Sequence, residues 1–167
     1  RRLIATGLLL SSSGWAGAAS APSLAGPGIA LALARARAAA ISDIRYDLAL
    51  DVTAADRATG TVTTSLQRRA NSGDLVLAFR GPLLGDVMVN GRPLAADTRR
   101  DGHLVLPQRL LRTGRNTLSA RFETPIAAAG AAIIRFHDDT DDQTYLYTLL
   151  VPSDANLLFP CLDQPAL

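Results

Sequence analysis

The chain has 167 residues, of which 48% are hydrophobic and 19% charged, and this length and balance are typical of one globular domain. All 17 basic residues are arginines, scattered along the chain without a dense patch or interleaved aromatic residues, which argues against nucleic-acid binding. The single cysteine, Cys161, excludes an internal disulfide and a cysteine-based zinc cluster, and we expect it to be a small buried side chain rather than a nucleophile.

Residues 1–19 have the features of a secretory signal peptide. Arg1 and Arg2 give a positive start, the apolar run 3–10 follows, and small residues lead up to Ala19. The pattern predicts an exported protein, periplasmic or secreted, and the arginine pair leaves the export route open. Because the apolar run is shorter than the roughly 20 residues that a bilayer needs, we expect no stable membrane insertion.

Residues 20–40 are interpreted as a linker followed by a short helix. The first part mixes Ala, Pro, Gly and Ser without periodicity, which is typical of a linker. Residues 29–40 are rich in alanine, and apolar residues recur at four-residue steps at Ile29, Leu33 and Ile41. The helix carries few charges, so we expect it to cover the edge of the domain rather than to contact a membrane.

The body of the chain begins with the period-two alternation of β-strands. Over 44–52 this alternation places five apolar residues on one face, which is expected to lie in the core: Ile44, Tyr46, Leu48, Leu50 and Val52. After a turn over 54–60, residues 62–66 repeat the pattern and predict an antiparallel partner. Residues 74–80 are apolar on both faces, which predicts a strand in the interior.

The second half of the body continues in short strands. Asn90 and Gly91 accept positive backbone angles and therefore predict a tight hairpin over 86–94. Further strands are expected at 103–106, at 133–137 and at 116–124, where Leu118, Ala120 and Phe122 face inward. Residues 107–114, with a helical turn, and 125–132 are predicted connections. About eight short strands at this spacing predict an all-β domain, either a sandwich or a barrel-like sheet.

Candidate metal and catalytic residues in this body are few. The acidic run 138–142 suits calcium, but it lacks the glycine and closing glutamate of the usual calcium loop, so a solvated hairpin turn is favoured. His103 and His137 fall on different predicted strands, and the lone glutamate, Glu123, has no histidine beside it. No zinc motif of the type His-Glu-x-x-His and no Gly-x-Ser-x-Gly nucleophile is present. We predict no catalytic or metal-binding residue in this chain.

The stretch 145–167 is the one that composition and periodicity do not explain. Apolar and aromatic side chains alternate along a predicted strand, with Tyr145, Tyr147 and Leu149 on one face. Pro152 should end this strand, because it cannot donate a hydrogen bond to a ladder. Ser153 or Asp154 is expected to cap a short helical turn that runs to Leu158.

A specific signature closes the chain: Phe159-Pro160-Cys161-Leu162-Asp163-Gln164-Pro165, with Asp154-Ala155 a few residues ahead. In these residues the chain resembles the zinc aminopeptidases of the aminopeptidase N family, at the point where the first domain joins the catalytic domain. Residues 41–48 resemble, more weakly, that family's opening strand. The resemblance covers 41–167 and implies the family's N-terminal domain, a curved and largely antiparallel β structure that packs on the catalytic domain.

The resemblance also implies a parent enzyme that releases N-terminal residues from peptides. Its zinc, its activated water and its peptide substrate would be held downstream of Leu167, so this chain alone is expected to contain no zinc and to be inactive. In the family, polar side chains eight and ten residues before the signature's Phe help to form the substrate pocket. Those positions hold Val151 and Leu149 here, and we carry them over as pocket-wall candidates although neither can bind an ammonium group.

Two other functions stay open at this stage. An exported β-sandwich could be a binding module that recognises a peptide, a glycan or a protein through its loops, and an inactive relative of the peptidase could serve as a scaffold. The sequence downstream would distinguish them, because an active enzyme requires His-Glu-x-x-His there.

Overall fold

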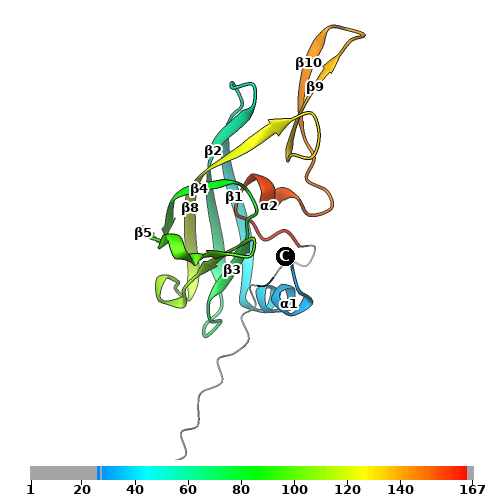
Figure 1. Cartoon of the computed structure of the whole chain (residues 1–167). Helices are drawn as coiled ribbons and strands as arrows, with labels where there is room; N and C mark the ends of the chain where they lie inside the picture. Colours follow the sequence, from blue (N-terminus) through cyan, green and yellow to red (C-terminus); the bar gives the residue numbers. More distant parts are fainter. Residues whose placement is uncertain (1–25, 27, 165–167) are drawn as a thin grey trace, which may run out of the picture.

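Two β-sheets face each other in the computed structural model, which describes residues 26 and 28–164 (Figure 1). The larger sheet has seven strands, and its main path β1-β2-β8-β4-β5 is antiparallel throughout. These strands are β1 Ile41–Asp51, β2 Arg57–Arg68, β8 Gly114–Ala127, β4 Leu83–Val89 and β5 Arg92–Pro93. The signal peptide predicted for residues 1–19 lies outside the described residues.

The remaining strands extend and cover this sheet. β9 Ile133–Asp138 pairs in parallel with β8, and β10 Gln143–Thr148 pairs with β9 as a hairpin that projects from the body (Figure 1). The smaller sheet has the order β3-β7-β6, with β3 Leu75–Ala78, β7 His103–Leu106 and β6 Arg99–Arg100. The prediction of an all-β, largely antiparallel domain is confirmed.

Four short helical segments accompany the sheets. They are α1 Leu31–Ala40, α2 Ala155–Leu158 and the 3-10 turns η1 Ala96–Thr98 and η2 Gln108–Leu110. Within the described part of the chain, none of these helices has the length and apolar character needed to cross a bilayer.

β8 forms the middle of the large sheet. It pairs with β2 along twelve consecutive positions and with β4 on its other side. Every second side chain from Asn116 to Ile126 is buried, including the predicted Leu118, Ala120 and Phe122. This strict alternation arises because successive side chains of a strand point to opposite faces of the sheet.

β3 lies between the large sheet and α1, so both of its faces are covered. Leu75 and Leu77 pack in one cluster with Leu66 and Leu118 of the large sheet. Val76 points the other way and packs on Leu33 of α1. All four residues of β3 are buried, which confirms the predicted interior strand. The alanine-rich helix is also confirmed, and it covers the outer side of the small sheet.

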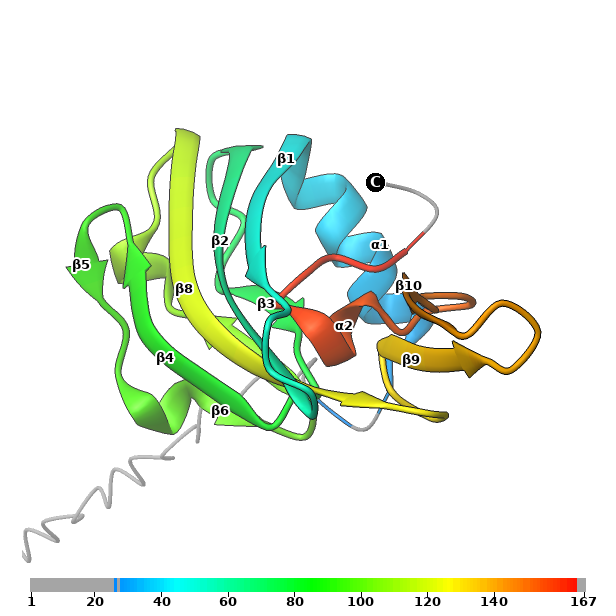
Figure 2. The ribbon, with the colours of Figure 1, turned by 90° about the horizontal axis from the view of Figure 1, so that it is seen from above.

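The small sheet covers only part of the inner face of β2 and β8. The rest is covered by α2 and the residues after it, which lie on the same side of the large sheet as β3 and α1 (Figure 2). Leu158, Phe159 and Cys161 pack there against Val62 of β2 and Phe122 of β8. The end of the chain is therefore part of the core.

The strand predicted over 44–52 is present as β1, but its apolar face is only half covered. Ile44 and Leu48 are partly buried, whereas Leu50 and Val52 are 40% and 36% exposed. β1 is the edge of the large sheet, and neither the small sheet nor α2 extends far enough to cover its second half. The prediction of a fully buried face was therefore wrong.

Two predicted connections are shorter than expected because strands extend into them. β2 begins at Arg57, inside the predicted turn 54–60, and β8 continues to Ala127, inside the predicted connection 125–132. Pro125 is tolerated in β8 because the pairing with β4 reaches only to Glu123, so no hydrogen bond to β4 is lost.

The tight hairpin is confirmed at Asn90 and Gly91. Both residues have positive φ, at 52° and 76°, and connect β4 to β5. Only residues that tolerate the left-handed region fit these two positions. The predicted helical turn in the connection 107–114 is also present, as η2.

Gly60 of β2 gives a test of this packing. A methyl group at this position would lie 2.5 Å from Cζ of Phe122 and 2.6 Å from the backbone oxygen of Ala49. We expect Gly60→Ala to lower the free energy of unfolding by about 1–3 kcal/mol, measured by urea denaturation. The control is Gly85→Ala in β4, where nothing lies within 4 Å of the added methyl group. Equal stability of the two variants would contradict the packing described here.

Candidate functional site

The candidate site is the stretch that leaves β10 and returns to the core. It consists of an exposed segment, 149–152, then α2, and then residues 159–164, which we call the signature segment. The backbone is fixed where it leaves the hairpin, since the N–H of Leu149 donates to the carbonyl of Ala132 at 3.0 Å. The N–H of Asp154 donates to the carbonyl of Leu150 at 3.0 Å, which closes the turn before α2.

Cys161 fixes the signature segment to the small sheet. Its backbone N–H and carbonyl exchange hydrogen bonds with Ala78 of β3, at 3.0 and 2.8 Å. The side chain is 3% exposed, and burial raises the pKa of its thiol to about 12. A thiol that stays protonated at neutral pH is a poor nucleophile, so the prediction of a small buried residue is confirmed.

Tyr46 of β1 fixes the same segment from the large sheet. Its ring meets the ring of Phe159 edge-on, with centroids 5.4 Å apart and planes at 65°. Its hydroxyl oxygen accepts the backbone N–H of Leu162 at 2.9 Å. Burial raises the pKa of this hydroxyl to about 12, which keeps it neutral. The phenol therefore holds the signature segment in place and has no ionised form near neutral pH.

Arg80 and Asp163 both fix the N-terminal end of α2. The guanidinium of Arg80, just after β3, donates to the amide oxygen of Asn156 at 2.6 Å and pairs with Asp154 at 2.5 Å. Asp163 accepts the backbone N–H of Ala155 at 3.2 Å. The predicted cap by Ser153 or Asp154 is therefore wrong: the carboxylate of Asp154 faces Arg80, and a carboxylate from the signature segment takes the helix terminus instead.

Gln164 joins the signature segment to α1. Its amide nitrogen donates to the carbonyl of Ala34 at 2.9 Å, and its amide oxygen accepts from Arg37 at 3.3 Å. Arg37 is 1% exposed and also donates from Nε to the carbonyl of Val76 at 2.7 Å. Burial lowers the pKa of its guanidinium to about 10, so it remains charged at neutral pH.

The two predicted pocket-wall residues lie on the exposed segment, on either side of the partly buried Leu150. Leu149 is 50% exposed and Val151 is 73% exposed. The peptide bond between Val151 and Pro152 is cis, and the turn that follows leads directly into α2. Because the backbone is fixed on both sides of this segment, it presents two apolar side chains in a defined place. Their role in a substrate pocket stays a prediction.

The outer part of the hairpin that leads into this segment is exposed on both faces, beyond the buried Ile133 and Ile134 at its base. Large apolar and aromatic side chains gather on it, each at least 39% exposed: Phe136, Tyr145, Leu146 and Tyr147. The predicted alternating strand is present, but it ends at Thr148 and neither face is covered by the described residues. Exposed apolar surface of this kind is typical of sites that another protein, a ligand or a membrane covers.

The acidic run 138–142 forms the turn of this hairpin. Asp138 accepts the backbone N–H of Thr140 at 2.8 Å, and Asp141 accepts that of Gln143 at 3.0 Å. The hydroxyl of Tyr145 donates to Asp141 at 2.5 Å, and this hydrogen bond raises the pKa of the tyrosine. Two of the carboxylates therefore hold the turn together, which confirms the predicted hairpin turn.

The two histidines are on different strands, as predicted. His103 of β7 is 2% exposed, and its Nδ1 donates to the carbonyl of Asp101 at 3.0 Å. Its buried Nε2 has no hydrogen-bond partner among the described residues. His137 lies on the exposed hairpin. Among residues 26 and 28–164, no three His, Cys, Asp or Glu side chains come together in a way that could hold a metal ion.

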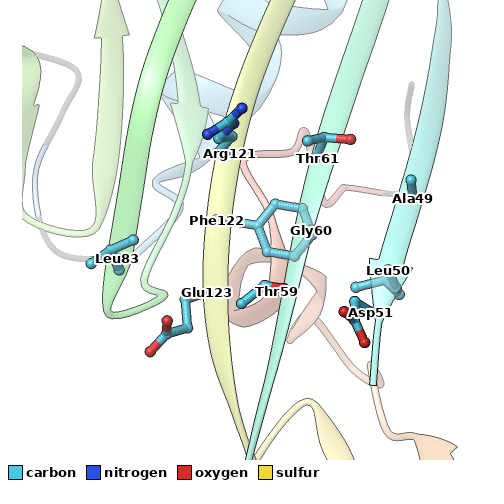
Figure 3. A pocket seen from close by; sticks show the side chains of 10 residues that line it. All are labelled: Ala49, Leu50, Asp51, Thr59, Gly60, Thr61, Leu83, Arg121, Phe122 and Glu123. Atoms are coloured by element: carbon cyan, nitrogen blue, oxygen red, sulfur yellow. The ribbon is translucent and has the colours of Figure 1, made fainter. Parts of the chain in front are cut away.

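A pocket of about 590 Å³ opens on the large sheet, away from the candidate site (Figure 3). Its lining residues come from β1, β2, β4 and β8 and include Arg121, Glu123 and the ring of Phe122 beside Gly60. Arg121 lies 3.4 Å from Asp86. Asp51 accepts hydrogen bonds from Thr53, which lower the pKa of its carboxyl.

Sequence reasoning missed the polar side chains that hold the candidate site. Arg37 and Arg80 were considered only among the scattered arginines, and Tyr46 was placed only by its strand period. One signal was available for Arg37: it lies four residues after Leu33, on the same face of the helix, so a buried face carried a charge that needed partners.

Comparison with known proteins identifies relatives of this fold. No family model matches the chain. Over 127 residues the chain is 32% identical to aminopeptidase N of Streptomyces lividans, a match that covers 73% of the chain and 14% of that protein. The chain therefore spans a small part of the length of the relative it matches.

Solved structures share the architecture. Native leukotriene A4 hydrolase from Saccharomyces cerevisiae matches with a TM-score of 0.62 and 20% identity, over 76% of this chain and 22% of that one. The yeast enzyme in complex with bestatin matches with a TM-score of 0.56 and 20% identity, over 83% and 25% of the two chains. This likeness shows a common fold.

The burial of His103 predicts that the free energy of unfolding depends on pH. Burial and the nearby charge of Arg37 lower the pKa of its imidazole below the ordinary 6.5, so the folded state favours the neutral ring. The unfolded chain then binds more protons below about pH 6.5, and stability falls as the pH drops, by at most about 1.4 kcal/mol per pH unit from this group. In urea denaturation between pH 7 and 5, we expect His103→Gln to lose less stability than the unmodified chain. If His103→Gln loses as much stability as the unmodified chain over this pH range, His103 does not contribute.

Proposed function

The chain belongs to the aminopeptidase N family, and we propose that it is the N-terminal domain of an exported zinc aminopeptidase that releases N-terminal residues from peptides. In this proposal the domain packs on the catalytic domain and helps to form the wall of the substrate pocket. The signature segment supports the proposal most directly. It is packed in the core at a defined position, and the exposed residues Leu149 and Val151 lie just before it in the chain.

The exposed hairpin supports the packing of a further domain. Aromatic side chains of β9 and β10, such as Phe136 and Tyr147, are about half exposed, although burying such rings in a protein interior is strongly favourable. The apolar surface continues from the hairpin into Leu149 and Val151. We infer that the catalytic domain covers the hairpin and that the pocket lies where the exposed segment meets it.

Zinc would be held outside the described residues. The residues described here do not form a zinc site. Within residues 26 and 28–164, no three side chains that could bind a metal ion come together, and Cys161 is buried in the core. In the complete enzyme, zinc would activate the water that cleaves the peptide bond. The residues described here would bind and orient the substrate without taking part in that step.

Apolar pocket-wall residues have a defined consequence for binding. An ammonium group that leaves water needs a charge or a hydrogen bond to offset the cost, and neither Leu149 nor Val151 can supply one. In this proposal, carboxylates of the catalytic domain bind the substrate's amino group without help from this domain. Leu149 and Val151 would contact the first side chain of the peptide instead.

The first test separates an enzyme from an inactive scaffold. We expect the complete protein to retain zinc stoichiometrically and to cleave aminoacyl reporter substrates, while this chain alone does neither, because no described residues form a metal site. Metal analysis and steady-state assays on both proteins give the result. A complete protein without zinc or activity would favour the scaffold, and one tightly held zinc in this chain alone would overturn the assignment.

The second test concerns the pocket wall. In the complete enzyme, Val151→Gln should change kcat/KM by an amount that corresponds to about 1–2 kcal/mol of transition-state stabilisation. This is the size of one hydrogen bond to a charged group. Val151→Ala should mainly lower the preference for bulky apolar first residues, because only packing is removed. The measurement is steady-state kinetics on a panel of aminoacyl reporter substrates.

A matched control uses an exposed apolar residue elsewhere, Leu83. Leu83→Gln changes a residue that is 53% exposed at the start of β4, in the separate pocket on the large sheet, and should leave kcat/KM unchanged. If neither Val151 variant moves kcat/KM for any substrate beyond that control, Val151 does not line the pocket.

A further inference from the structure

The fold gathers arginines that are scattered in sequence at one end of the large sheet. The strands bring three connections together there: Arg68 pairs with Gly114 and with Ile41, and Asn90 donates its amide hydrogens to the carbonyl of Leu110 and the side chain of Asn116. We call this the arginine-rich end and define it by six exposed residues: Arg45, Arg69, Arg92, Arg109, Arg112 and Arg115.

Two pairs of these arginines are neighbours in the structure. Arg45 and Arg115 line one shallow pocket together with Asp43. The guanidinium of Arg92 donates to the backbone carbonyl of Arg109 at 3.1 Å. The fold thus corrects the expectation, drawn from sequence, that the arginines form no dense patch.

Few negative charges offset these arginines. None of the six forms an ion pair within 4.0 Å in the described part of the chain. Asp43 lies beside Arg45, and Asp74 already accepts the backbone N–H of Gln108 at 2.8 Å. Asp97 and Arg100 line the adjoining pocket and offset each other in charge. The arginine-rich end therefore keeps a clear positive excess.

The opposite end of the molecule has the opposite charge. The β9–β10 hairpin carries four aspartates in its turn, residues 138–142, and it projects from the far end of the sheet (Figure 1). The β1–β2 connection lies at that end too, since Arg135 of β9 donates to the carbonyls of Ala54 and Ala55. The domain therefore has a positively charged end and a negatively charged end along the strands of the large sheet.

We propose that the arginine-rich end docks on an anionic phospholipid surface. Guanidinium groups bind phosphate oxygens with paired hydrogen bonds, and clusters of four to eight basic residues bind anionic lipid membranes. Single-stranded nucleic acid fits less well, because it needs aromatic platforms and the segments 68–74, 90–95 and 107–116 contain no aromatic residue. The partner is thus a surface of lipid phosphates, bound without insertion.

Docking at this end would also orient the domain. An anionic surface attracts the arginine-rich end and repels the acidic turn, so the hairpin and the exposed segment 149–152 would point away from the lipid. The inference does not depend on the proposed peptidase function, because the arginine-rich end shares no residue with the candidate site.

The test is co-sedimentation of the chain with vesicles of phosphatidylcholine, with and without phosphatidylglycerol. Each basic residue near an anionic surface contributes a factor of about five, so Arg109→Gln with Arg112→Gln should lower the partition coefficient onto anionic vesicles by at least about tenfold. The matched control, Arg57→Gln with Arg121→Gln, removes the same charge from exposed arginines outside that end and should lower it far less. Raising the salt from about 0.1 M to about 1 M should abolish binding, because the Debye length falls from about 10 Å to about 3 Å.

Each outcome decides the proposal. Binding that depends on phosphatidylglycerol, and that the Arg109 and Arg112 pair weakens more than the control pair does, supports it, provided that circular dichroism shows both variants folded. Equal binding to neutral vesicles, or equal loss in both pairs, overturns it. A single-stranded oligonucleotide that binds more tightly than anionic vesicles, through the same arginines, would overturn the lipid partner.

Discussion

The inner face of the large sheet is longer than the small sheet can cover, and the rest of the structure depends on this mismatch. β2 and β8 have 12 and 14 residues, whereas β3 and β7 have four each. At about 3.3 Å per residue, a strand of roughly 45 Å faces one of roughly 13 Å. Without a further cover, Val62, Phe122 and Ile126 would be exposed. The last described residues, α2 and the signature segment, cover these side chains.

This arrangement explains why the signature segment combines apolar residues with groups that bind fixed partners. Phe159, Cys161 and Leu162 supply the apolar cover, while Asp163 and Gln164 bind α2 and α1 through their side chains. A backbone segment that crosses the core without belonging to a full sheet must satisfy its own polar groups, and Ala78 and Tyr46 meet that need. The segment is thus held by packing and hydrogen bonds together.

Strand periodicity predicted most of the fold because burial in β8 and β3 follows directly from the side-chain pattern. Strand periodicity failed where burial depends on a second layer that covers the strand. β1 has the same alternation of apolar residues as β8, but it lies at the sheet edge and no second layer covers its second half. The cap of α2 could not be predicted either, because Asp163 comes from beyond the helix and Arg80 draws Asp154 away. These hydrogen bonds and ion pairs join residues that are far apart in sequence, so the local sequence around α2 does not predict them.

The same limit applies to charge. Arg45, Arg69, Arg92 and Arg115 are far apart in sequence, and only the antiparallel register brings their strand ends together. The sign of the charge at each end of a sheet is thus a property of topology as much as of composition. A net charge of +2 conceals a domain with a basic end and an acidic hairpin.

The core and the exposed segment are subject to different physical demands. Substitution of Leu149 or Val151 alters few buried contacts, because both side chains are at least half exposed and the backbone is held by Ala132 and by the turn before α2. Changes at such positions usually alter stability by no more than about 0.5 kcal/mol. The signature segment, in contrast, cannot change without uncovering Phe122 or leaving polar groups unsatisfied. The fold therefore holds this exposed segment in a fixed place while leaving its side chains free to differ, which is how apolar residues can stand where the resemblance implies polar ones.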